Sequence, residues 1–346
     1  MSNVRYLGRS QDDTARPQQN NADRQENAGP DDQGRGRHAT SPWQIPWKGW
    51  KDILIRTYRE FGRDRLQAVA AGVVFYALLA LFPAITALVS SYALFAKGST
   101  INDHLATLAG LLPSGAFDIV RDQVNRVLSK GDAKLGFAFA FSFLLAVWSA
   151  NGGTKAMMDA LNVAYEEEEK RGFFKLNAVS LAFTFGGLIA ALLAIGSIVA
   201  VPIILATIGL GSVADAVLRI GRWPVLIVAM MLGLAVLYRY GPSRSSARWQ
   251  WVTPGSLFAT VTWLIGSALL SFYLSNYANY DATYGSLGAA IGLMIWMWMS
   301  TIVVLLGAEL NAEIEHQTAA DTTEGGDQQI GERGARVADT VGEAKT

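Results

Sequence analysis

The sequence feature that most constrains the fold is an uncharged apolar run close to the C-terminal end. It extends from Gly288 to Ala308, and polar residues follow from Glu309 onward. As an α-helix, the run would be about 31 Å long, which matches a bilayer hydrocarbon core of about 30 Å. Gly285, Gly288 and Gly292 would present a small-residue face, on which another helix can pack closely. The run therefore predicts a transmembrane helix that packs inside a bundle.

Similar apolar runs recur along the chain, which has 346 residues, 51% of them hydrophobic and 17% charged. Clustered apolar residues in these proportions are typical of a polytopic membrane protein. We predict an all-α fold with six transmembrane helices, at about residues 66–96, 135–154, 176–202, 219–240, 253–275 and 286–310. Lys plus Arg and Asp plus Glu both number 29, so the net charge favours neither an acidic nor a basic partner.

Aromatic and basic residues mark the segment that leads into the first span, residues 43–66. Trp47, Trp50 and Tyr58 recur at helical spacing, and Lys and Arg occupy much of the remaining surface. This pattern predicts an interfacial helix, which lies in the headgroup region of a membrane. The pattern fits an amphipathic helix docked on the protein's own bundle equally well, and both interpretations stay open.

Polar sequence flanks the predicted membrane domain, residues 43–315, on both sides. Residues 1–42 and 316–346 contain too little apolar surface to offset the entropy of ordering, so we predict that both tails are disordered. Lys and Arg are concentrated before the first span and in the second-to-third and fourth-to-fifth loops. The positive-inside rule therefore predicts two cytoplasmic termini, with the loop between the first two spans on the outer side. An apolar stripe at helical spacing, from Phe117 to Leu128, predicts that this loop is helical.

Short motifs spread over residues 48–315 occur in a fixed order. They include Leu81-Phe82-Pro83, Trp148-Ser149-Ala150-Asn151, Phe173-Phe174-Lys175, Leu237-Tyr238-Arg239, Pro254-Gly255 and Leu306-Gly307-Ala308-Glu309-Leu310-Asn311. In order and spacing, these motifs resemble the YihY/BrkB family of bacterial inner-membrane proteins, which has also carried the name ribonuclease BN. The resemblance implies a six-helix, multi-pass protein of the bacterial inner membrane whose biochemical activity is not firmly assigned.

Residues suited to catalysis or metal binding are sparse. The chain has no cysteine, and its three histidines, His38, His104 and His316, lie far apart. Metal-dependent RNA hydrolysis requires clustered His, Asp or Glu ligands, so we expect neither ribonuclease activity nor a nucleic-acid partner. Residues 152–155, Gly-Gly-Thr-Lys, lack the GxxxxGK[ST] spacing of a phosphate-binding loop, and we interpret them as a helix break. We predict no catalytic site, no metal and no cofactor.

Polar and aromatic side chains within the predicted spans form the main candidate site. Such groups are costly at membrane depth, so they usually face a cavity or one another. The candidates for the lining of one cavity are Tyr76, Pro83, Trp148, Ser149, Asn151, Trp263, Tyr273, Tyr277, Tyr280, Asp281 and Tyr284. Hydrogen bonds between helices and aromatic belts at the membrane surface are the alternative explanation, and the residue types favour it.

A second candidate site is a polar group at the inner end of the last span. Glu309 is predicted to lie within reach of Arg239, at the inner end of the fourth span, and Asn311 could complete the group by bonding backbone carbonyls. We interpret the three residues as a structural clasp. A proton- or ion-coupling role for Glu309 is the alternative.

The sequence thus predicts a membrane protein that binds or translocates a lipid or other amphiphile without nucleotide hydrolysis. The observations behind this prediction are the polar and aromatic interior, the long outer loop and the missing catalytic residues. The alternative is a scaffold or envelope-integrity factor that acts through its tails and outer loop. Membrane lipids are the expected partners, and the sequence does not indicate an oligomeric state.

Overall fold

A computed structural model describes residues 34–95, 121–122, 125, 132–208, 212–276 and 288–344. Six long helices dominate the fold: α3 (Leu66–Phe95), α6 (Asp132–Ala164), α7 (Phe173–Ile208), α8 (Ser212–Tyr240), α9 (Trp249–Asn276) and α11 (Gly288–Glu315). They are preceded by a short 3-10 helix, η2 (Pro42–Gln44), and by α2 (Trp47–Arg63). Within these ranges the only pairing of β type is an isolated bridge between Ala247 and Thr323. The prediction of an all-α fold is confirmed for the described residues.

Among the residues that the structure describes, four stretches are long and apolar enough to cross a membrane. They are Phe173–Ala190, Ile220–Tyr240, Trp249–Leu274 and Ala290–Glu315, which lie in α7, α8, α9 and α11. The two remaining predicted spans coincide with the long helices α3 and α6. Almost all of the predicted outer loop lies outside the described residues.

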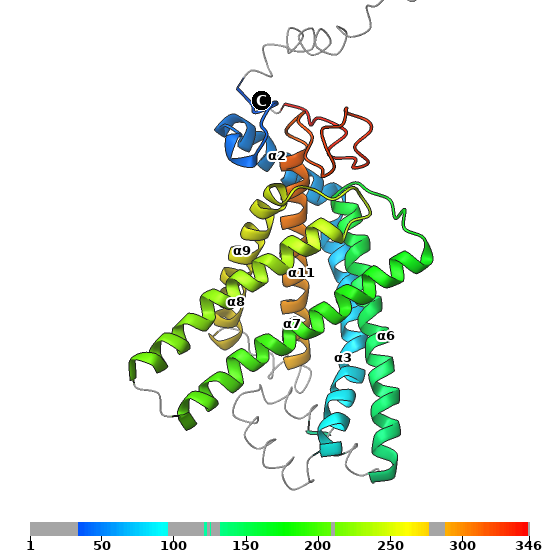
Figure 1. The fold of residues 1–346 in the computed structure, drawn as a ribbon, viewed down its shortest axis with the longest axis vertical. Helices are drawn as coiled ribbons and strands as arrows, with labels where there is room; N and C mark the ends of the chain where they lie inside the picture. The colour runs from blue at the N-terminus through cyan, green and yellow to red at the C-terminus, as the bar shows by residue number, and fades with distance from the viewer. Residues whose placement is uncertain are drawn as a thin grey trace, which may run out of the picture.

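The long helices alternate in direction, so the loops after α6 and α8 lie at one end of the molecule, beside α2 and the C-terminal segment (Figure 1). We call this the capped end. α3 packs along α6, and α11 contacts α3, α6 and α9. α7 and α8 run side by side at a steep angle to the others, and their far ends extend to one side (Figure 1). The largest fully buried side chains, such as Trp251, Tyr165 and Tyr238, lie toward the capped end.

Helices α9 and α11 approach each other very closely near the capped end. A Cβ atom added at Gly255 would lie 2.1 Å from the carbonyl oxygen of Gly307, so only glycine fits there. Asn311 accepts a hydrogen bond from the Gly255 N–H (2.7 Å) and donates one to the Val252 carbonyl (3.1 Å). Gly292 belongs to the predicted small-residue face, and a Cβ atom added there would lie 3.7 Å from Leu274 Cδ1. Gly285, from the same predicted face, is outside the described residues.

The C-terminal segment contradicts the prediction of a disordered tail. Residues 316–344 fold back over the helix ends, and many of their side chains are buried. We call this segment the C-terminal cap. The prediction was wrong because it counted only apolar surface, whereas the cap is held by buried polar and charged side chains. Residues 34–42 of the predicted N-terminal tail also pack there, with Arg37 donating to the Gln317 carbonyl at 3.3 Å. Residues 1–33 lie outside the described part of the chain.

Candidate functional site

The described cavity candidates fall into two groups. Tyr76 of α3 lies 3.6 Å from a Cβ position built at Gly152 of α6, near the half-buried Ser149 and Asn151. Trp148 is 80% exposed, so its ring points away from the protein core. Pro83 lies inside the unbroken helix α3. Asn151 Oδ1 is buried and has no hydrogen-bond partner among the described residues.

The second group lies where α9 faces α11. Trp263 donates its indole N–H to Ser300 (2.9 Å) and packs edge-on against Trp296, with ring centroids 5.9 Å apart. Tyr273, on α9, is about half exposed. Tyr277, Tyr280, Asp281 and Tyr284 lie outside the described residues. The lining of a single cavity by all these residues therefore stays a prediction.

Polar contacts between α6 and α7 were not anticipated from the sequence. Lys155 donates to the side-chain oxygen of Asn177 at 2.7 Å, and the hydroxyls of Thr154 and Thr184 are 2.9 Å apart. Gly153 of α6 faces α3, and a Cβ added there would be in ordinary van der Waals contact with Ala77, 3.7 Å from its nitrogen. The interpretation of residues 152–155 as a helix break is wrong. α6 continues through them to Ala164.

The predicted clasp of Arg239, Glu309 and Asn311 does not form as expected, because Arg239 has another partner. Arg239 forms an ion pair with Glu324 of the cap, donates to the Ala247 carbonyl at 2.7 Å and stacks on the Trp249 ring. It does not pair with Glu309. The prediction failed because the cap, which supplies Glu324, was expected to be disordered.

Glu309 is 2% exposed, and its Oε2 atom has no hydrogen-bond partner in the described structure. The charges that act on it most strongly are carboxylates, with Glu313 on its own helix and Glu60, Asp64 and Glu166 on neighbouring segments. Burial, followed by the charges of Glu60 and Glu166, raises the pKa of Asp64 to about 6. Asp64 and Glu309 therefore lie in an acidic environment between α2 and the end of α11.

Two buried ion pairs connect the helices at the capped end. Arg244, in the loop after α8, donates to both oxygens of Glu315 (2.9 and 2.7 Å), and their side chains are 1% and 0% exposed. Arg244 also lies over the Tyr165 ring, where burial raises the pKa of the phenol and Arg244 opposes that rise. Arg56 of α2 pairs with Glu313 of α11 and donates to Gln317 of the cap at 2.8 Å.

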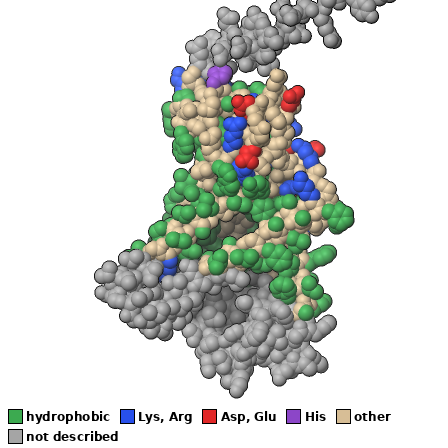
Figure 2. All heavy atoms as spheres, in the orientation of Figure 1, with side chains coloured by type: hydrophobic (Ala, Val, Ile, Leu, Met, Phe, Trp, Pro, Cys, Tyr) green, Lys and Arg blue, Asp and Glu red, His purple; other side chains and the backbone are tan. Residues whose placement is uncertain are grey.

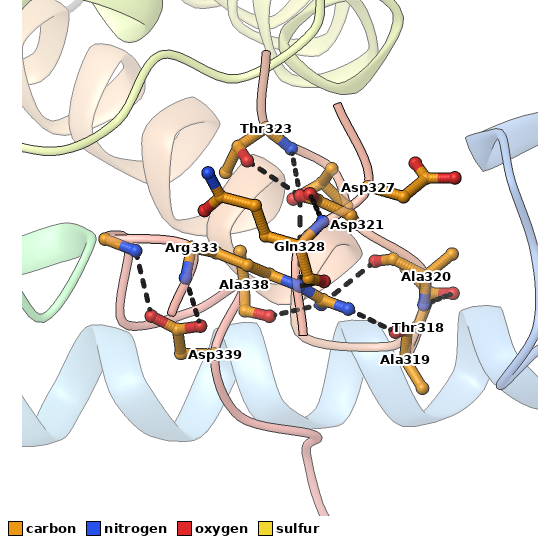
Figure 3. A network of polar contacts seen from close by, with 12 residues as sticks. Thr318, Ala319, Ala320, Asp321, Thr323, Asp327, Gln328, Arg333, Ala338 and Asp339 are labelled. Carbon is orange, nitrogen blue, oxygen red and sulfur yellow. Dashed lines mark hydrogen bonds and ion pairs between the residues drawn. The ribbon is translucent and has the colours of Figure 1, made fainter. Parts of the chain in front are cut away.

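The inside of the cap is organised around Arg333 (Figure 3). Its guanidinium donates to four backbone carbonyls, those of Ala319 (2.8 Å), Ala320 (3.2 Å), Gln328 (3.2 Å) and Ala338 (2.6 Å). Two carboxylates complete the network by accepting backbone N–H groups. Asp339 accepts from Gly331, Arg333 and Gly334, and Asp321 accepts from Thr323 and Gln328. These bonds explain how a segment with few apolar residues folds.

The sequence model of a family described as virulence factor BrkB matches residues 57–331. The chain belongs to the BrkB family. The match confirms the resemblance, and it extends beyond the helices into the first half of the cap. No solved structure matches the chain.

Relatives of this BrkB-family chain carry names that describe a membrane protein or a ribonuclease-like one. The chain is 32% identical to the ribonuclease-like protein YfkH of Bacillus subtilis over 250 residues, which cover 71% of this chain and 89% of YfkH. It is 26% identical over 272 residues to a UPF0761 membrane protein of Delftia acidovorans, covering 78% of this chain and 62% of that protein. A third relative, UPF0761 membrane protein IL2447 of Idiomarina loihiensis, is 23% identical over 283 residues, which cover 79% and 95% of the two chains.

The outer surface of this BrkB-family protein is divided between charged and apolar regions. Charged side chains gather near the capped end, and hydrophobic side chains cover the helices below it, around a hollow (Figure 2). The exposed apolar residues include Phe185, Leu188, Ile189 and Leu193 on α7, and Trp223, Val225, Val228 and Leu232 on α8. Within the described ranges, no group of three or more His, Asp and Glu side chains is arranged to hold a metal ion.

Proposed function

We propose that this BrkB-family protein crosses the bacterial inner membrane six times, with both termini in the cytoplasm, and binds or translocates a lipid or other amphiphile without nucleotide hydrolysis. The observation that carries the proposal is the hollow with a hydrophobic rim (Figure 2). Contiguous apolar surface of this kind marks a membrane or ligand contact. A hollow with an apolar rim suits the acyl chain of a lipid or other amphiphile.

The polar contacts of α6 support an amphiphile rather than a purely apolar ligand. Lys155 is half-buried between α6 and α7, where Asn177 is its hydrogen-bond partner. Lys155 directly follows the second predicted span, residues 135–154, so it lies near the level of the lipid headgroups, where a lysine can attract an anionic group. We assign Lys155 the role of contacting an anionic headgroup that reaches the α6–α7 contact.

The topology in the proposal is supported by the helix directions. The described part of the N-terminal region and the cap lie at the same end, and so do the loops that carry Lys170, Arg171 and Arg244 (Figure 1). Lys and Arg concentrate on the cytoplasmic side of membrane proteins. Reporter fusions at both termini test this arrangement, because reporters on opposite sides would contradict it.

The test of function is lipid movement in reconstituted vesicles. We expect vesicles containing the protein to expose fluorescent phospholipid of the inner leaflet to an external quencher faster than empty vesicles do. Lys155→Gln should slow this exposure, whereas Lys175→Gln should not, since Lys175 is exposed at the start of α7. Equal rates with and without protein, together with no co-purified lipid, would overturn the proposal.

A scaffold role has one observation in its favour, because the cap presents an ordered surface with exposed charges such as Glu324 and Asp327. Deletion of the tail does not separate the two functions. Since the cap is packed into the helix ends, its deletion should damage a transporter and a scaffold alike. Substitution of Asp327, whose side chain is 90% exposed, is the better test, because it changes the outer surface and leaves the packing intact.

A further inference from the structure

Helix α2 lies across the capped end, in the layer where two of the long helices begin. Before α2, the Thr40 carbonyl accepts a hydrogen bond from the side chain of Gln250 (2.8 Å), in the first turn of α9. At its other end, α2 is separated from the first residue of α3, Leu66, only by Asp64 and Arg65. The helix therefore runs along the plane in which α9 and α3 enter the apolar layer (Figure 1).

One face of α2 is fully occupied by the protein. Gly49, Asp52, Ile53, Arg56 and Thr57 are buried. Asp52 accepts hydrogen bonds from Arg35 at 2.7 and 2.6 Å, and Arg56 pairs with Glu313. This packing agrees with the interpretation that α2 is docked on the bundle. It also fixes which face of α2 points outward.

The opposite face carries aromatic and basic side chains on one stripe. Trp47, Lys51, Leu54 and Tyr58 follow one another at steps of four, three and four residues, and all are exposed. Trp47 is 75% exposed and Tyr58 is 81% exposed, far more than aromatic side chains of a packed helix. Lys48 and Arg59 lie beside the stripe and are exposed as well. We call this set the outer face of α2.

The chemistry of the outer face suits one partner. Trp and Tyr are enriched at the level of lipid headgroups, because their rings are apolar and their N–H or O–H groups are polar. Each Lys or Arg near an anionic bilayer surface is attracted to the headgroups. Glu60 pairs with Arg63 at 3.1 Å and offsets its charge, so the positive charge of the outer face comes from Lys48, Lys51 and Arg59.

We propose that the outer face of α2 rests on the anionic headgroups of the bilayer and anchors the capped end to the membrane surface. The inference is independent of lipid translocation. The two interpretations of residues 43–66 are then compatible, because one face docks on the bundle and the other contacts lipid.

The absence of cysteine makes a site-specific test possible, because any introduced cysteine is the sole labelling site. We would attach an environment-sensitive fluorophore to Leu54→Cys in the full chain, reconstituted either in phosphatidylcholine or in phosphatidylcholine with phosphatidylglycerol. The control is Gln329→Cys, at an exposed position of the cap. With phosphatidylglycerol present, the Leu54 label should shift to the blue and lose fluorescence to a quencher carried on lipid, and the Gln329 label should do neither.

The charge dependence provides the second arm. The combined change Lys48→Gln, Lys51→Gln and Arg59→Gln should reduce lipid quenching of the Leu54 label while leaving the melting temperature in detergent unchanged. Three outcomes would overturn the proposal. The first is that iodide, a quencher dissolved in the water, reaches both labels equally. The second is that lipid quenching is the same with and without phosphatidylglycerol. The third is that the Leu54 label is protected from iodide and from the lipid-carried quencher alike, which would indicate a protein partner.

Discussion

The capped end and the α7–α8 pair are built by different means. At the capped end, charged side chains such as Arg244, Glu315 and Arg333 are almost completely buried, and each is matched by several partners. Along α7 and α8, large apolar side chains remain exposed, and neighbouring helices cover little of them. The first region is held together by specific polar pairing within the protein. The second is complete only when lipid covers it.

This difference separates the effects of mutation. A substitution at the capped end should change the stability of the isolated protein, because it removes an interaction between two residues of the protein. A substitution on α7 or α8 should act mainly through the surrounding membrane.

Arg244→Ala should have the largest effect. It leaves Glu315 buried without its charged partner, and the removal of one member of a buried pair costs about 3–5 kcal/mol. Unfolding in detergent micelles measures the loss. The matched control is Arg248→Ala, because Arg248 and its partner Asp327 are 37% and 90% exposed and such pairs contribute at most about 1 kcal/mol. Equal losses in the two variants would contradict the account.

Arg333→Met should release the cap while leaving the helices folded. The variant loses a charged donor to four carbonyls, and one hydrogen bond to a charged group contributes about 1.5–3 kcal/mol. Limited proteolysis should then cleave residues 316–344 at a dose that spares the wild type. Arg336→Met is the control, because that side chain is 66% exposed. A cap that resists protease in both variants would show that Arg333 does not organise it.

Two glycine substitutions compare the regions directly. Gly255→Ala places a methyl group against the Gly307 carbonyl, and overpacking of this kind costs about 1–3 kcal/mol. Gly233→Ala, on α8, meets no atom within 4 Å and should be neutral or stabilise the helix by up to about 1 kcal/mol. Thermal unfolding of both variants in the same detergent gives the comparison. A loss at Gly233 as large as that at Gly255 would mean that α8 is packed as tightly as α9.

The smallest effect concerns pH. The pKa of Asp64 rises on folding from 3.8 to about 6, so its contribution to stability is complete below pH 3.8 and is lost as the pH rises through about 6. Relative to Asp64→Asn, the wild type should therefore become less stable across that interval.

Glu169 should show the opposite dependence of stability on pH. Burial opposes its charged form, but hydrogen bonds from Arg171 outweigh this and lower its pKa from 4.5 to about 2, so its contribution is lost as the pH falls below 4.5. Melting curves of the wild type, Asp64→Asn and Glu169→Gln, measured against pH, distinguish the two signs.

The helices could be predicted from the sequence because uncharged length and hydropathy determine which segments enter a bilayer. The run from Gly288 to Ala308 became most of α11, and Asn311 indeed bonds the neighbouring helix, at Val252 and Gly255. These features depend on residues close together in sequence or on one strong periodicity.

The cap could not be predicted in this way, because its stability depends on contacts between distant residues. Arg244 and Glu315 are 71 positions apart, and Arg56 and Gln317 are 261 apart. The segment after Glu315 has a polar composition, which alone predicts disorder. Composition does not show that these polar groups have buried hydrogen-bond and ion-pair partners elsewhere in the chain. The error at Arg239 has the same origin, since its partner Glu324 belongs to the cap.

The most direct test of the account is an electron cryo-microscopy map of the protein in a nanodisc of bacterial phospholipids. The account predicts elongated, acyl-chain density inside the hollow of Figure 2, while the cap remains ordered against α2 and α11. A hollow filled by the protein's own side chains, with lipid only around the outside of the bundle, would contradict it.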